Sequence, residues 1–344
     1  MLDHVERVTK MAGVAVPAIA AATELSLQRI ATAKEKLAPF RTGGIDVVAF
    51  GSMARLETTS ESDFDYLVLA TSLPEEADAP DRLLREADAL RKIWAVEEGR
   101  EKPEVRAPGA TGVFGTVIGA FDLVDQIGLQ QDTNHSLTRR MLLLEESVSL
   151  LDEAVHTEVV RAALHRYMTL AEAGEDKVPR FLLNDVIRYW RTITVDYQAK
   201  TRAVEHVSGL RYIKLIIPRK VLYAGTLMSL LMCGKDHGHQ ANVDDLLGEF
   251  SKSPLARLVS PYDHAPSHVQ DAMVGVLGVV DTYLELSGQA QWREIVKAAS
   301  KTDDSPAPEF LEMCEQARTL QHYLETIFFD WDTLHADSRN LLAF

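Results

Sequence analysis

Short apolar runs alternate with amphipathic stretches over the first third of the chain. The runs at 45–50 (IDVVAF) and 63–70 (DFDYLVLA) are brief, rich in β-formers and bounded by Gly or polar residues, which predicts buried strands. At 18–38 and about 80–97, apolar residues recur every three or four positions, as on one face of a helix. Gly51 and the residue after it open a short helical turn between the strands. The predicted order is helix, strand, turn, strand, helix.

Helical periodicity dominates the rest of the chain. A Pro- and Gly-rich stretch carries one more short β-like run at 113–118, which we interpret as a loop with a short strand. No further strand is expected after it. The main helical stretches are expected at 121–168, 180–202 and 210–232, the last interrupted at Pro218, with three more running to the C-terminus.

These elements predict an α+β protein made of two domains. A small mixed-sheet domain with an N-terminal helix is expected over residues 1–150, and an all-helical domain over 151–344. A chain of 344 residues is long enough to give each domain its own core. We expect the active site in a cleft between the domains.

Charge and cysteine content exclude several classes of protein. The net charge of −15 repels polyanions and argues against non-specific DNA binding. With only Cys233 and Cys314, the chain has neither a disulfide framework nor a zinc signature, which favours a reducing, cytoplasmic location. The stretch 11–22 has the composition of a signal-peptide core, but Asp3 and Glu6 stand where basic residues belong. No run is long enough to predict a membrane span.

The candidate chemistry lies in residues 50–70. Asp63 and Asp65 are two positions apart, so on a strand they face the same side at about 7 Å, and their oxygens suit hard cations. Gly51 lets the backbone approach a phosphate closely, and Ser52 adds donors where a helical turn begins. The segment is therefore a candidate metal and phosphate site.

A Gly-Ser turn, then ten residues, then Asp-Phe-Asp entering an apolar strand resembles the DNA polymerase β-like nucleotidyltransferase superfamily. The resemblance covers about 110 residues as a domain and about 20 as motifs. It implies attack of a hydroxyl on the α-phosphate of a nucleoside triphosphate, with pyrophosphate leaving. It also implies two Mg²⁺ ions held at Asp63 and Asp65, and β- and γ-phosphates held at Gly51 and Ser52.

The superfamily adds a third carboxylate from a neighbouring strand, which this sequence does not show plainly. Asp132, in a polar break before a helix, is the first candidate catalytic and metal-binding residue, and Asp122 is the second. Both also fit an ordinary place at a helix cap or on a helix face. Without a third carboxylate, a degenerate, nucleotide-binding member of the superfamily becomes the alternative.

The order of parts also resembles the uridylyltransferases that modify the PII protein, in which a helix similar to 136–150 follows the catalytic strands. That resemblance would bring Arg139 or Arg140 near the site. The match is incomplete at Thr138, where that family tends to have an acidic residue beside the arginine.

Basic residues on two apolar helices are candidates for the opposite wall of the cleft. Arg188 and Arg191 share a helix face, and Lys214 lies on the next helix. A triphosphate needs such cations when it leaves water. Acidic neighbours such as Asp185 and Asp196 could instead pair with them.

The sequence thus predicts a Mg²⁺-dependent nucleotidyltransferase whose acceptor is a protein, a small molecule or a tRNA end. A nucleotide second-messenger synthase and a non-catalytic nucleotide-binding regulator are the alternatives. His237 and His239 are interpreted as loop residues, not metal ligands. The choice of nucleotide is open, and so is a homodimer.

Overall fold

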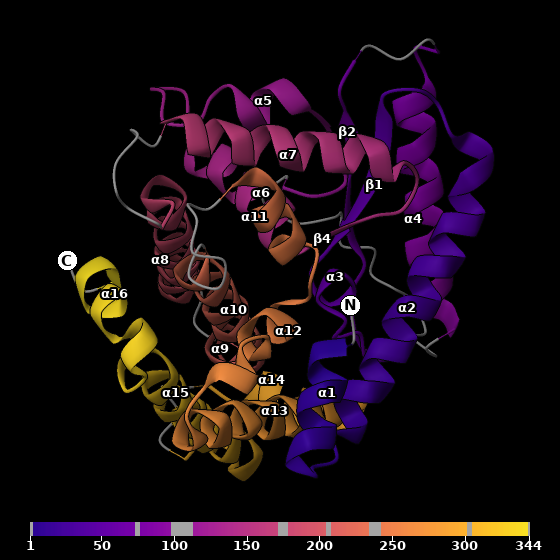
Figure 1. Ribbon diagram of the computed structural model, residues 1–344. Coiled ribbons are helices and arrows are strands. Elements are labelled where there is room, and N and C mark those ends of the chain that lie inside the picture. Colours follow the sequence, from indigo (N-terminus) through magenta and orange to yellow (C-terminus); the bar gives the residue numbers. More distant parts are fainter. Residues whose placement is uncertain are drawn as a thin grey trace. The chain divides into compact units, whose positions relative to one another are not determined.

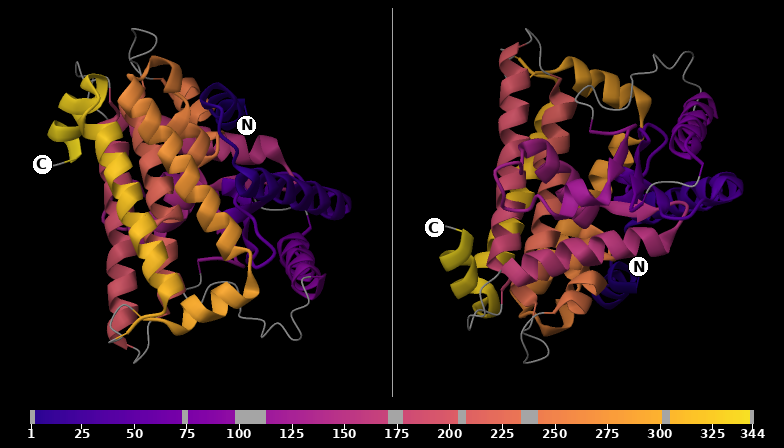
Figure 2. Two further views of the ribbon diagram at one scale, coloured as in Figure 1. Left: turned by 90° about the horizontal axis from the view of Figure 1, so that it is seen from below. Right: turned by 90° about the horizontal axis from the view of Figure 1, so that it is seen from above.

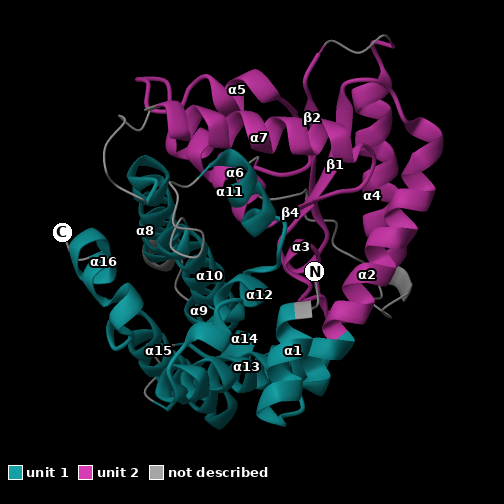
Figure 3. Cartoon of the chain, in the orientation of Figure 1, with its two compact units in different colours: residues 1–21, 174–344 teal, residues 22–173 magenta. Residues whose placement is uncertain are grey.

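The computed structural model describes residues 3–72, 76–97, 113–170, 178–203, 208–233, 242–300 and 305–342 (Figure 1). The chain divides into two compact units, residues 22–173 and residues 1–21 with 174–344 (Figure 3). We call them the sheet unit and the helical unit and describe each by itself.

The sheet unit holds all the described strands and the helices around them. Its strands are β1 (Ile45–Phe50), β2 (Asp65–Ala70), β3 (Val117–Gly119) and β4 (Ser147–Ser149). Its helices are most of α2 (Pro17–Leu37), the 3₁₀ turn η1 (Ala38–Phe40), α3 (Ser52–Arg55), α4 (Ala79–Glu97), α5 (Ala120–Val124), α6 (Asn134–Glu145) and α7 (Glu153–Leu170).

The four strands form one mixed sheet in the order β3-β2-β1-β4. β1 is antiparallel to β2, with the register running from Ile45 opposite Ala70 to Phe50 opposite Asp65. β4 is also antiparallel to β1, whereas β3 is parallel to β2. The expectation of an α+β protein with a small mixed sheet is confirmed at this level.

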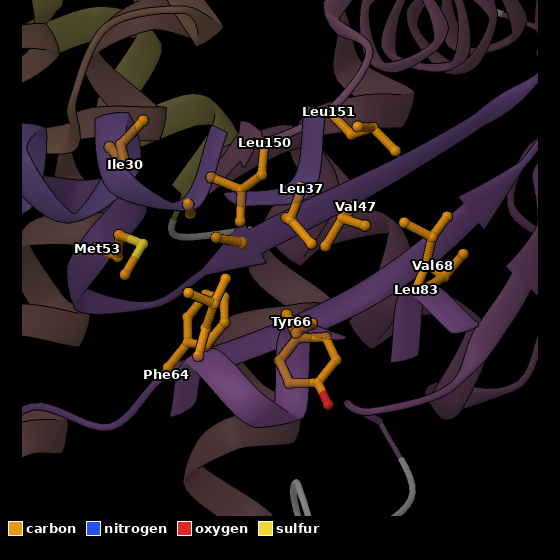
Figure 4. Close-up of a cluster of buried hydrophobic side chains, with 14 of the residues drawn as sticks. Ile30, Leu37, Val47, Met53, Phe64, Tyr66, Val68, Leu83, Leu150 and Leu151 are labelled. Carbon is orange, nitrogen blue, oxygen red and sulfur yellow. The ribbon is translucent and has the colours of Figure 1, made fainter. Parts of the chain in front are cut away.

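One face of the sheet packs against α2 and α4 because alternate strand residues are apolar on that side. Ile30 and Leu37 from α2 and Leu83 from α4 meet Val47 and Val68 in a buried cluster (Figure 4). Phe64 lies in the same cluster, stacked on Tyr66 and edge-on to Trp94. Because Phe64 and Tyr66 share this side, Asp65 between them projects to the opposite side of the sheet.

The helical unit contains α1 and the C-terminal half of the chain, and its long helices α13 and α15 run alongside each other (Figure 2). Its helices are α1 (Asp3–Ala12), α8 (Arg180–Ala203), α9 (Gly209–Ile216), α10 (Pro218–Met232), α11 (Val243–Phe250), α12 (Pro254–Val259), η2 (Tyr262–His264), α13 (Ser267–Ser287), α14 (Ala290–Ala298), α15 (Pro308–Phe329) and α16 (Asp332–Leu342). Helix α10 is almost wholly buried, and Gly225 lets it approach α12 so closely that an added Cβ would lie 2.2 Å from the Pro254 carbonyl oxygen.

Most of the predicted elements are confirmed, and one expectation is wrong. The strands near 45–50 and 63–70, the helices near 18–38, 80–97 and 180–202, and the break at Pro218 all appear, although β2 begins at Asp65 and not at Asp63. The expectation that no strand follows residue 118 fails, because β3 extends to Gly119 and β4 forms at Ser147–Ser149. β4 has three residues between two helices, too few to give a period of two, and it exists through pairing with β1. His237 and His239 lie outside the described residues.

Helices α9 and α10 together form a span, 209–232, that is long and apolar enough to cross a membrane by length and composition among the described residues. Within this span, 72% of the apolar window is buried inside the protein. The expectation that no run is long enough to span a bilayer is therefore wrong by length and composition, although most of this apolar window packs inside the protein.

Candidate functional site

The Gly-Ser turn and the second aspartate meet at one end of the β1–β2 pair. Phe50, the last residue of β1, lies opposite Asp65, the first residue of β2. Gly51 follows with φ 68° and ψ −140°, a conformation that a residue with a side chain rarely adopts. A Cβ built on Gly51 would lie 3.5 Å from Asp65 Oδ2. A side chain at position 51 would therefore be in van der Waals contact with the Asp65 carboxylate, and glycine leaves that space open.

The two aspartates of the DFD motif differ in environment. Asp65 is half-buried at the start of β2, whereas Asp63 is exposed in the loop before the strand. That loop is held in place because the backbone N–H of Thr58 donates to Ser26 Oγ of α2 at 3.1 Å and that of Thr59 donates to Ser62 Oγ at 2.9 Å. The sequence predicted that Asp63 lies on the strand. In the structure Asp63 lies in the loop before β2.

Asp132 does not join Asp63 and Asp65. Its two carboxylate oxygens accept hydrogen bonds from Arg140, at 3.1 and 2.8 Å. Arg140 is fully buried and also donates to the hydroxyl of Tyr167 at 2.7 Å. Over the described residues, no group of three or more His, Cys, Asp and Glu side chains is arranged to hold a metal ion. The structure thus places Asp132 in an ion pair with Arg140, which also reaches α7 through Tyr167. The metal-binding and catalytic role expected of Asp132 stays a prediction.

The remaining candidates in the sheet unit are Asp122, Arg139 and Arg140. Asp122, the second choice for the third carboxylate, is exposed on α5. Burial lowers the pKa of Arg139, and the charge of Asp122 partly opposes that shift. Arg140, which the resemblance would bring near the site, is buried in the sheet unit and binds Asp132 and Tyr167.

The predicted basic wall belongs to the helical unit. Arg188 and Arg191 lie on α8 and Lys214 on α9. Arg188 is paired with Asp185 at 3.8 Å, as the alternative interpretation anticipated, and Arg191 is exposed. The cleft between the units stays a prediction, and so does any contact of these cations with the phosphates.

Three charged residues beside the Gly-Ser turn were missed by the sequence analysis. Arg55, at the end of α3, is buried with the carboxylates of Glu57 and Glu146 around its guanidinium. The signal available in the sequence was the arginine three positions after Ser52. Glu146 could not be linked to it because 91 positions separate the two residues.

Comparison with protein-family models, curated proteins and solved structures found no match. The geometry of the residues around Gly51 and Asp65 is therefore what bears on function.

Proposed function

We propose that this protein is a Mg²⁺-dependent nucleotidyltransferase. It transfers a nucleoside monophosphate from a nucleoside triphosphate to a hydroxyl group of a protein, small-molecule or tRNA acceptor. The hydroxyl oxygen forms a bond to the α-phosphorus, the bond from that phosphorus to the bridging oxygen of the β-phosphate breaks, and pyrophosphate leaves.

The observation that carries this proposal is the approach of Gly51 to Asp65. A glycine backbone free of Cβ, followed by the Ser52 hydroxyl, lies beside a half-buried carboxylate at the end of two paired strands. A polyphosphate needs close backbone donors, and a hard cation needs carboxylate oxygens. Both kinds of group are found at the same end of the β1–β2 pair, where Phe50 lies opposite Asp65.

The donor set fits magnesium. Mg²⁺ is commonly bound by one or two carboxylates together with substrate phosphates, and it keeps several waters. Asp63 and Asp65 supply the carboxylates, and the exposure of Asp63 leaves room for water and phosphate oxygens. When bound, the ions would lower the pKa of the attacking hydroxyl and offset the charge on the leaving pyrophosphate. Gly51 and Ser52 would orient the β- and γ-phosphates.

The test is turnover of labelled nucleotide. The protein is incubated with each of four α-labelled nucleoside triphosphates and Mg²⁺, alone and with cell extract. Label on a macromolecule supports transfer to a protein or tRNA acceptor. A small labelled product that forms without extract supports a second-messenger synthase instead, and binding without turnover supports a regulatory nucleotide-binding protein.

The site is tested with Asp63→Asn and Asp65→Asn together. Turnover should be lost because the ions lose their anionic ligands, while the thermal midpoint stays near that of wild type. The matched control is Asp78→Asn with Asp81→Asn, which removes two exposed carboxylates from the same unit. Full activity in the double variant at 63 and 65 would refute the proposed site.

A further inference from the structure

Arg55 ends α3 with its guanidinium buried between two carboxylates. Its Nε donates to Glu57 Oε2 at 2.7 Å, and its Nη1 donates to Glu146 Oε2. The side chains of Arg55, Glu57 and Glu146 are only 9%, 5% and 0% exposed, respectively. We call these three residues the Arg55 clamp.

The clamp is held together electrostatically. Burial alone would lower the pKa of Arg55, but the nearby carboxylates of Glu57 and Glu146 raise it above its ordinary value. The arginine is therefore fully charged at any physiological pH. Removing Arg55 would take this cation away from two buried carboxylates, which costs more than replacing all three side chains by apolar groups.

The clamp encloses a strained turn. Gly51 and Leu56, on either side of α3, both have positive φ, 68° and 62°, and Leu56 is the only non-glycine residue in the described part of the chain that does. Inside the turn, Arg55 N–H donates to the Gly51 carbonyl at 3.0 Å and Glu57 N–H to the Ser52 carbonyl at 2.8 Å. A side chain in the left-handed region persists only where its surroundings impose it. The clamp supplies such a constraint at the C-terminal end of α3.

The far end of the clamp is fixed to the sheet. Glu146 immediately precedes β4, and the next residue, Ser147, lies opposite Phe50 of β1. Phe50 in turn lies opposite Asp65 of β2. Glu146 therefore adjoins the row of paired residues that carries Asp65, and Arg55 links the Gly-Ser turn to that row by a second route besides the chain itself.

We propose that Arg55 is a positioning residue, which holds the Gly51–Ser52 turn at the level of Asp65 through Glu57 and Glu146. It acts through the turn and need not touch nucleotide or metal. Its effect on turnover rests on the proposed nucleotidyltransferase function, whereas its effect on the turn does not. A phosphate-binding turn displaced by about 1 Å would be expected to slow the chemical step about 100-fold.

The experiment compares three variants of the full chain. Arg55→Met leaves both carboxylates buried and should lower the thermal midpoint as well as kcat. A triple variant, Arg55→Met with Glu57→Leu and Glu146→Leu, replaces the clamp by apolar groups and should recover the midpoint, because buried ion pairs exchange for apolar packing at little cost. Arg55→Lys keeps the charge and the fold but loses the fork that binds two carboxylates.

A positioning role predicts that the triple variant and Arg55→Lys stay about 100-fold low in kcat, with a much smaller change in the KM for nucleotide. A merely structural role predicts that kcat returns with the thermal midpoint, and that outcome would overturn the proposal. Arg82→Lys is the control, since Arg82 forms an exposed ion pair with Glu76 in the same unit.

Amide hydrogen exchange reads out the turn without reference to activity. Exchange at Arg55 and Glu57, whose N–H groups close the turn, should speed up at least tenfold in Arg55→Lys, while Val47 and Val68 in the central strands keep wild-type rates. If wild-type protein turns over no nucleotide, the proposed function fails and exchange still decides the clamp. Unchanged exchange in the turn would exclude the positioning role.

Discussion

Arg140 grips Asp132 through two hydrogen bonds, 3.1 and 2.8 Å long, and both side chains are withdrawn from solvent, 0% and 3% exposed. The pair joins the loop before α6 to the guanidinium that also reaches Tyr167 of α7. A bidentate pair of this kind is among the strongest polar contacts in proteins. It bears directly on how variants of Asp132 should behave.

Asp132→Ala should destabilise the protein by about 3–5 kcal/mol, because it takes this carboxylate away from the buried charge of Arg140. Urea denaturation measures the loss. Asp122→Ala, at an exposed position on α5, should change the free energy of unfolding by no more than about 0.5 kcal/mol. If Asp132→Ala keeps wild-type stability but abolishes Mg²⁺-dependent turnover, then Asp132 is a ligand after all.

Gly51→Ala should cost about 1–3 kcal/mol of stability, because the new Cβ forces a side-chain residue into a backbone conformation at φ 68° that glycine alone adopts readily. Turnover should fall as well, since the methyl group lies on the path between the turn and Asp65. The contrasting variant is Gly248→Ala in α11, where an added Cβ meets nothing within 4 Å. That change should stabilise the helix by about 0.5–1 kcal/mol. Equal effects at the two positions would contradict the strained geometry at Gly51.

The raised pKa of Asp46 predicts that this residue's contribution to the free energy of unfolding falls as pH rises. Asp46 is fully buried in β1, where burial raises its pKa to about 6 against the bonds that its carboxylate accepts from the backbone N–H groups of Asp152 and Leu151. A raised carboxyl pKa means that the folded state binds the proton more tightly than the unfolded state. The resulting stabilisation, about 3 kcal/mol, is complete below pH 4 and is lost as pH rises through 6.

Asp46→Asn keeps an acceptor for both N–H groups but cannot ionise. The free energy of unfolding of the wild type, relative to this variant, should therefore decline between pH 4 and pH 7. Denaturation series at several pH values in that interval measure the difference. Parallel profiles for the two proteins would show that Asp46 does not titrate with a raised pKa.

His156 should act in the opposite direction over nearly the same interval. Burial, with a contribution from the charge of Lys34, lowers its pKa to about 4, and its Nε2 lies 2.7 Å from Ser147 Oγ. A histidine whose folded pKa is depressed stabilises the protein above about pH 6.5 and loses that stabilisation as pH falls through 4. The wild-type protein should lose free energy of unfolding as pH falls from 6.5 to 4 because His156 becomes protonated. His156→Gln should abolish this loss, and Asp46→Asn should retain it. An NMR titration of the imidazole with a midpoint near 6.5 would contradict this.

The elements around the site follow from local pattern, and the contacts that complete it do not. The sequence predicted four of these elements: β1, α3, β2 and α4. Each is marked by an apolar run or by helical spacing inside its own short stretch of sequence. The meeting of Gly51 with Asp65 follows from a hairpin-like pairing of neighbouring strands. The start of β2 at Asp65 is where its pairing with β1 begins, with Phe50 opposite Asp65, and the spacing of apolar residues does not show that register.

The long-range partners were beyond a reading of spacing. Glu146 contacts Arg55 although 91 positions separate the two residues. Asp132 pairs with Arg140, and the residues around Arg140 in the sequence do not reveal that its side chain is buried. An acidic residue in a polar break looks the same whether it binds a metal or an arginine. The proposed wall at Arg188, Arg191 and Lys214 belongs to the other unit, so no strand or helix pattern in the sheet unit could locate it.

The two strands of the site, β2 and β1, lie at the centre of the sheet, and the second neighbour of β1 is β4. β2 is made about 20 residues after β1, but β4 emerges from the ribosome only about 100 residues after β1. At the usual rate of synthesis this leaves one edge of β1 open for roughly 5–20 s in each new chain. During that interval Glu146 is not yet made, so the contact between Arg55 and Glu146 forms only after the last strand of the sheet has been synthesised.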